Sequence, residues 1–141
     1  MKLNTMRIWL GGAAGGVGWL VWSFLIGMKE APFYPAMQQQ GLFLKQPRYS
    51  LFAAIWVLLI FVISIFLAHL YAWSRATLGA GPKTAVKIGM IVGFCAGFPG
   101  NFAQATWSPI PRVMPLGWML DIWIGAIIAT VIAGALYKDR A

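Results

Sequence analysis

Long apolar runs, separated by shorter polar or proline-containing segments, make up most of this sequence. The runs cover about 8–28, 51–73, 85–107 and 116–137. Each is close to the roughly 20 residues that cross the hydrocarbon core of a bilayer as an α-helix. Because the runs are continuous and do not alternate with polar residues, they are not the pattern of a transmembrane β-barrel. The sequence therefore predicts an all-α fold, an integral membrane four-helix bundle that forms one transmembrane domain over residues 1–141.

Composition agrees with this prediction. Hydrophobic residues account for 60% of the chain and charged residues for 10%, whereas charged residues make up roughly a quarter of a soluble domain. The formal net charge is +8. Because the basic residues flank the apolar runs and do not cluster on one face, this charge gives information about membrane orientation. We expect the lipid bilayer, and no nucleic acid, as a partner.

The distribution of basic residues predicts that both termini lie in the cytoplasm. With the termini inside, the cytoplasmic side holds Lys2, Arg7, Arg75, Lys83, Lys87, Lys138 and Arg140. The opposite side holds Lys29, Lys45, Arg48 and Arg112. Seven of the 11 basic residues are then cytoplasmic, as the positive-inside rule favours. We predict a multi-pass protein of the plasma (bacterial inner) membrane, with the connection of residues 29–50 on the outer side.

Small residues recur at four-residue spacing in three of the four runs. Such spacing places glycines on one face of a helix, where they let a neighbouring backbone approach closely. The third and fourth runs carry matching stripes and are joined by a short connection, so we expect them to cross closely. The glycines predicted to lie at helix–helix contacts are Gly11, Gly12, Gly15, Gly16, Gly89, Gly93, Gly97, Gly117 and Gly125.

One carboxylate, Asp121, lies inside the fourth run, where a charge is costly and requires a physical reason. Asn101 and Gln104, at the end of the third run, are expected at a similar depth and could donate hydrogen bonds to it. Arg112 in the connecting segment could form an ion pair with it. This polar intramembrane cluster has two interpretations. It either fixes the pairing of two helices, or it handles protons or cations.

Other candidate chemistry is limited. The lone Cys95 lies within the third run and cannot form an internal disulfide, and no phosphate-binding loop or zinc-protease motif occurs. His69 lies near the cytoplasmic end of the second run. It is interpreted either as a histidine at the headgroup boundary or as an axial ligand to a haem or chlorophyll-type pigment, because neutral imidazole is a common metal ligand. We predict no metal site and no catalytic residue.

The layout resembles a group of small four-helix bacterial membrane proteins known only as a domain of unknown function. The first run contains Gly12-x-x-x-Gly16-x-Gly18-Trp19 and continues into Trp22–Ser23, and the third contains Gly-x-x-x-Gly-x-x-x-Gly. The last ends in Gly125-Ala-Ile-Ile-Ala-Thr-Val-Ile-Ala-Gly134. The long connection of residues 29–50 departs from that pattern. The resemblance implies a four-helix membrane fold and no particular activity.

The leading functional interpretation is a non-enzymatic membrane protein, an accessory or structural subunit that packs in an oligomer or a larger complex. Its expected partners are other membrane subunits or further copies of itself. The runner-up is a small transporter or channel with a polar path at Asp121, Asn101 and Gln104. A third interpretation is a pigment- or haem-binding membrane subunit that uses His69.

Overall fold

The computed structural model describes residues 3–139, and within this range all regular structure is helical. Lys2 and Arg140, two of the basic residues counted above, lie outside the described residues. In chain order the elements are α1 (Thr5–Glu30), the short 3-10 helix η1 (Ala31–Phe33), α2 (Tyr34–Gln39), α3 (Phe52–Leu78), α4 (Pro82–Trp107) and α5 (Val113–Leu136). The described part contains four helical spans long and apolar enough to cross a membrane, the first running through α1, η1 and α2. The predicted all-α, four-helix membrane fold is confirmed.

The helices extend beyond the apolar runs where the local sequence permits. Helix α4 begins at Pro82, whose fixed φ suits a first helical turn, after Gly79 and Gly81 turn the chain with φ of 85° and 130°. At its C-terminal end, α1 continues through Glu30 and passes directly into η1 and α2. The predicted connection of residues 29–50 is therefore partly helical, and Met37 of α2 is buried.

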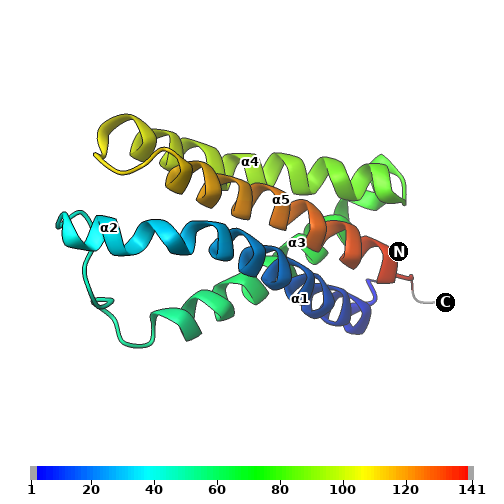
Figure 1. Cartoon of the computed structure of the whole chain (residues 1–141). Helices are drawn as coiled ribbons and strands as arrows, with labels where there is room; N and C mark the ends of the chain where they lie inside the picture. The colour runs from blue at the N-terminus through cyan, green and yellow to red at the C-terminus, as the bar shows by residue number, and fades with distance from the viewer. Residues whose placement is uncertain (1–2, 140–141) are drawn as a thin grey trace.

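Helix α5 lies in the middle of the bundle. It contacts α1, α3 and α4, whereas α3 and α4 touch each other over a smaller area. Figure 1 shows α4 and α5 running side by side, with α1 below them and α3 diverging from α1 toward the connection that follows α2. The last helix of the chain thus joins the other three.

Two of the four glycines of α1 singled out from the sequence face α5. A Cβ atom on Gly11 would lie 3.1 Å from the backbone of Ala133, and one on Gly15 would lie 2.6 Å from the carbonyl oxygen of Ala129. The two helices run antiparallel, so Gly15, one turn after Gly11, faces Ala129, which lies one turn before Ala133. Their backbones are in direct contact along this face.

The other two face α3. A Cβ atom on Gly12 would lie 2.7 Å from Cα of Ile65, and one on Gly16 would lie 2.6 Å from the ring of Phe61. The paired glycines of α1 therefore serve two different neighbours, one face for α5 and the adjacent face for α3.

Helix α4 packs on α5 through its own glycine stripe. A Cβ atom on Gly89 would lie 2.6 Å from Cα of Ile127, and one on Gly93 would lie 2.8 Å from the carbonyl oxygen of Trp123. Gly97 continues the stripe, with a Cβ distance of 3.1 Å to the carbonyl oxygen of Met119.

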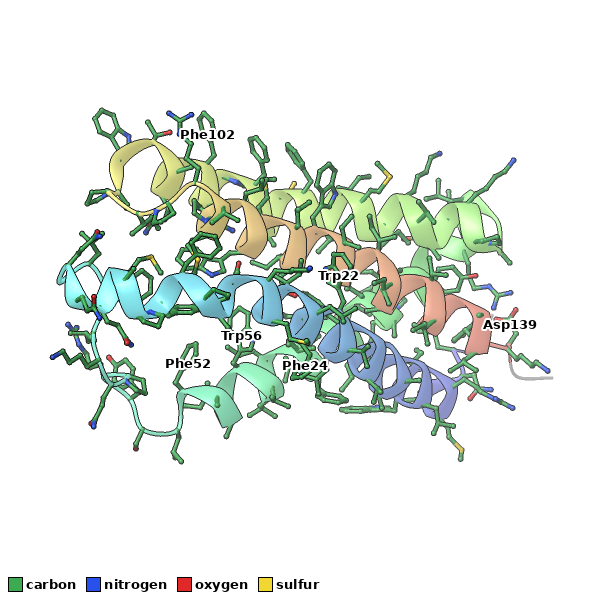
Figure 2. All side chains as sticks on the ribbon, in the orientation of Figure 1. Trp22, Phe24, Phe52, Trp56, Phe102 and Asp139 are labelled. Carbon is green, nitrogen blue, oxygen red and sulfur yellow. The ribbon has the colours of Figure 1, made fainter. Side chains whose placement is uncertain are left out.

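The two ends of the chain meet at one end of the bundle. The backbone N–H of Asn4 donates to the hydroxyl of Tyr137 at 3.2 Å, and Arg75 pairs with Asp139 at 3.1 Å. The Arg75 guanidinium also lies 4.9 Å from the centroid of the Tyr137 ring. Figure 2 shows Asp139 at this end, beyond the last turn of α5. Both termini thus lie on the same side of the bundle.

We expect Gly15→Ala to destabilise the bundle by about 1–3 kcal/mol, the usual cost of overpacking a close contact. The added methyl group would meet the backbone of Ala129, which cannot move aside as a side chain can. Gly27→Ala is the matched control in the same helix, because nothing lies within 4 Å of its Cβ position. It should be neutral or stabilising, by up to about 1 kcal/mol. Thermal unfolding in mild detergent measures both, and equal transition temperatures would contradict the packing described here.

Candidate functional site

Asp121 lies on the face of α5 that meets α1 and is 8% exposed. Its Oδ1 atom accepts a hydrogen bond from Nε1 of Trp19 at 3.2 Å and another from Oγ of Ser23 at 2.5 Å. Trp19 and Ser23 are four residues apart and therefore lie one above the other on α1. Gly125 makes room for the indole, because a Cβ atom there would overlap the Trp19 ring.

A third bond across the same contact uses the backbone of α5. Nε1 of Trp22 donates to the carbonyl oxygen of Leu120 at 3.0 Å. Figure 2 shows Trp22 between α1 and α5. Three side chains of α1 therefore donate hydrogen bonds to α5 over this stretch. In lipid such bonds stabilise a helix pair, because no water competes for the donors.

A second carboxylate, that of Glu30, lies on the face of α1 that carries Trp19 and Ser23. It follows Ser23 by seven residues, or two helical turns, and is only 5% exposed. Its carboxylate lies against Gly117 of α5, where a Cβ atom would overlap the Oε1 atom. Oε1 is buried, and no group among the residues that the structure describes forms a hydrogen bond with it.

We refer to Trp19, Ser23 and Glu30 of α1, with Gly117 and Asp121 of α5, as the acidic seam. The chain has three acidic residues, and the seam holds two of them. The third, Asp139, pairs with Arg75 at the other end of the bundle, and this is the one ion pair within residues 3–139. Neither carboxylate of the seam therefore has a basic partner in the described part of the chain.

The polar cluster expected from the sequence does not assemble around Asp121. Nδ2 of Asn101 donates to the carbonyl oxygen of Gly97 in its own helix at 2.6 Å. Gln104 is exposed and accepts from Oγ of Ser108 at 2.5 Å. Arg112 is exposed at the start of α5. Across the residues that the structure describes, none of the three predicted partners forms a hydrogen bond with Asp121.

The reason is the face on which Asp121 lies. Around Gly97, α4 contacts Met119 and Ile122 of α5, whereas Asp121 lies on the neighbouring face toward α1. The hydrogen bonds of Asp121 therefore join α5 to α1, whereas the sequence predicts that they join α5 to α4.

Sequence reasoning did not single out Glu30. Lys29 and Pro32 on either side of it favour a loop outside the membrane, which places Glu30 in the predicted connection of residues 29–50. The available signal was its seven-residue spacing from Ser23, which places both on one face of a continued helix.

The remaining candidate ligand, His69, is half-buried in α3. Its Nδ1 lies 2.9 Å from the carbonyl oxygen of Ile65, which can only accept, so Nδ1 carries a proton and Nε2 points to other partners. The rings of Trp9 and Trp73 lie beside it, at centroid distances of 6.5 Å and 5.8 Å. This is the tautomer that a pigment ligand would use, and the pigment interpretation stays a prediction. Within residues 3–139 no three His, Cys, Asp or Glu side chains group to hold a metal ion.

No protein-family model, no curated protein and no solved structure matches this chain. The resemblance to four-helix bacterial membrane proteins of unknown function therefore stays a prediction, and the acidic seam itself carries the functional argument.

We expect Asp121→Asn to keep most of the stability of the bundle and Asp121→Leu to lose more. An amide oxygen can still accept from Trp19 and Ser23, whereas leucine leaves the buried Trp19 donor and the partly buried Ser23 donor without a partner, at up to about 1–3 kcal/mol each. Thermal unfolding in detergent measures the difference. Adding Ser23→Ala to Asp121→Leu should recover part of the loss, since one stranded donor is removed. A Leu variant as stable as the Asn variant would show that these bonds do not hold α1 to α5.

Proposed function

We propose that this protein is a small membrane transporter or channel for cations, the proton included, and that the acidic seam is its cation site. The observation that carries this proposal is the Oε1 atom of Glu30, which is buried at the contact of α1 with α5 and has no hydrogen-bond partner within residues 3–139. A carboxylate in that position takes up a proton or binds a cation, because an unpaired charge away from water is too costly.

The two carboxylates of the seam differ in their surroundings, which supports a division of roles. Asp121 is held by two donors and so is positioned by the helix pair. In the described part of the chain no group donates to Oε1 of Glu30, which leaves that atom to accept a proton or a cation. The polar path expected at Asp121, Asn101 and Gln104 is thus revised to Asp121 and Glu30.

An accessory or structural subunit, the leading interpretation from the sequence, is the second candidate. The hydrogen bonds of Asp121 to α1 favour it, because they describe a residue that fixes a helix pair. This interpretation also drew support from the glycine faces, which could bind helices of partner subunits. Those faces are occupied inside the bundle, where they meet α3, α5 or α1, so they do not favour a partner.

We further propose the bacterial inner membrane as the location, with both termini in the cytoplasm. Single cysteines at positions 40 and 79, introduced in a Cys95→Ala background, test this orientation. Gln40 follows α2 and Gly79 ends α3 at the opposite end of the bundle. An impermeant thiol reagent added to intact cells should modify position 40 and leave position 79 unmodified, and the reverse result would invert the orientation.

Purified protein in lipid vesicles should admit protons under an inside-negative potential, measured with an internal pH-sensitive dye. Glu30→Gln should lower the initial rate at least tenfold, because the amide cannot take up the proton. Asp121→Asn should also lower it. Asp139→Asn is the matched control, since it removes the one carboxylate outside the seam. Uptake no faster than in empty vesicles, or a full rate in Glu30→Gln, would contradict the proposed function.

A further inference from the structure

A groove lies between α4 and α5 at the end of the bundle where one helix leads into the other. It has a volume of about 270 Å³ and is partly open to the surface. Figure 2 shows Phe102, one of its lining residues, on α4 near the connection to α5. The lining also includes Phe98 and Asn101 of α4, Arg112, and Leu116 and Met119 of α5. None of these residues belongs to the acidic seam.

The groove brings together two polar residues that form no hydrogen bond with Asp121. Arg112 is its one charged lining residue, is exposed, and forms no ion pair with any residue in the range 3–139. Asn101 donates one amide hydrogen to the carbonyl oxygen of Gly97 and keeps a second N–H for another acceptor. The groove therefore offers a positive charge and a hydrogen-bond donor to a ligand.

Large apolar side chains form most of the walls. The rings of Phe98 and Phe102 stack with their centroids 5.6 Å apart, and Leu116 on the opposite wall is 50% exposed. A free inorganic anion gains nothing from such walls, whereas an acyl chain contacts them along its length. A helix of a second copy is disfavoured, because helices associate in lipid through small residues that let their backbones approach.

The groove begins at the depth where lipid headgroups are expected. The third candidate span ends at Trp107 and the fourth begins at Val113, so Arg112 lies between the ends of two spans. Trp107 is 86% exposed, as is typical of an aromatic residue at the membrane–water interface. Phe98 and Met119 lie farther into the spans, toward the hydrocarbon core. The charge and the apolar walls thus follow the polarity of a phospholipid from headgroup to chain.

We propose that this groove binds an anionic phospholipid, with the phosphate at Arg112 and Asn101 and an acyl chain against the apolar walls. The planar guanidinium group matches the geometry of a phosphate and binds it through two parallel hydrogen bonds. Basic residues at a membrane surface also favour lipids with a net negative charge. The site shares no residue with the acidic seam, so it does not depend on the proposed function.

Native mass spectrometry of the full-length protein, in mild detergent with added dioleoyl lipids, tests this site. We expect the first phosphatidylglycerol to bind about fivefold more tightly than the first phosphatidylcholine, which carries the same chains and no net charge. Arg112→Gln should remove this preference. Arg48→Gln is the matched control and should keep it, because Arg48 is an exposed basic residue that does not line the groove.

The acyl chain is tested separately from the headgroup. Leu116→Trp places a larger side chain in the groove, so it should weaken phosphatidylglycerol binding to a similar degree while Arg112 stays in place. Leu58→Trp adds the same side chain at an exposed position of α3 outside the groove and should leave binding unchanged. Soluble glycerol phosphate, which has the charge and no chains, should not displace the lipid.

Several results would overturn this inference. They are equal binding of the two lipids, a preference that persists in Arg112→Gln, and unaltered binding in Leu116→Trp. Displacement by glycerol phosphate would indicate a site for free anions, and a dimer that disappears in Leu116→Trp would assign the groove to a second copy of the chain. If either variant does not fold, judged by its thermal transition, the comparison of the two lipids and glycerol phosphate on the unaltered protein decides.

Discussion

Helices α1 and α5 approach each other so closely that their backbones touch, and most of the structure depends on this contact. Gly15 faces the carbonyl oxygen of Ala129, and Gly11 faces the backbone of Ala133 one turn away. Inside a bilayer the hydrophobic effect does not draw helices together, so such van der Waals contact takes its place. It also sets the register, because a shift of one residue would bring larger side chains against the opposite backbone.

The same register decides where the acidic side chains lie in the half of the helix pair away from Asn4 and Tyr137. Continuing along the shared face, Ser23 meets Asp121, and Glu30 meets Gly117. One carboxylate therefore arrives opposite hydrogen-bond donors and the other opposite a residue without a side chain. Packing by small residues in one half of the helix pair thereby creates a polar site in the other half, and the site cannot shift without disturbing the packing.

The sequence was sufficient to predict the four spans, because the length of an apolar run reports directly on crossing a bilayer. It was also sufficient to place the glycines on helix faces. It could not assign those faces to neighbours, since helical periodicity shows which residues share a side and not what lies opposite. Because neighbouring runs in the sequence are expected to pack together, the sequence predicts Asn101 as a partner of Asp121. In the structure its partners come from α1. The sequence does not predict a site at Glu30, because the apolar run ends near residue 28 and α1 continues past it to Glu30.

The central place of α5 has a consequence for how the protein is made. Helices enter the membrane in the order of synthesis, and of these four spans α5 is the last to leave the ribosome. Until then, the face of α1 that carries Gly15, Ser23 and Glu30 has no partner from its own chain. The nascent protein must therefore hold an acidic side chain at an unfinished interface while about 80 further residues are added, the distance from Glu30 to Val113. A chain interrupted before α5 would lack the surface that buries this carboxylate.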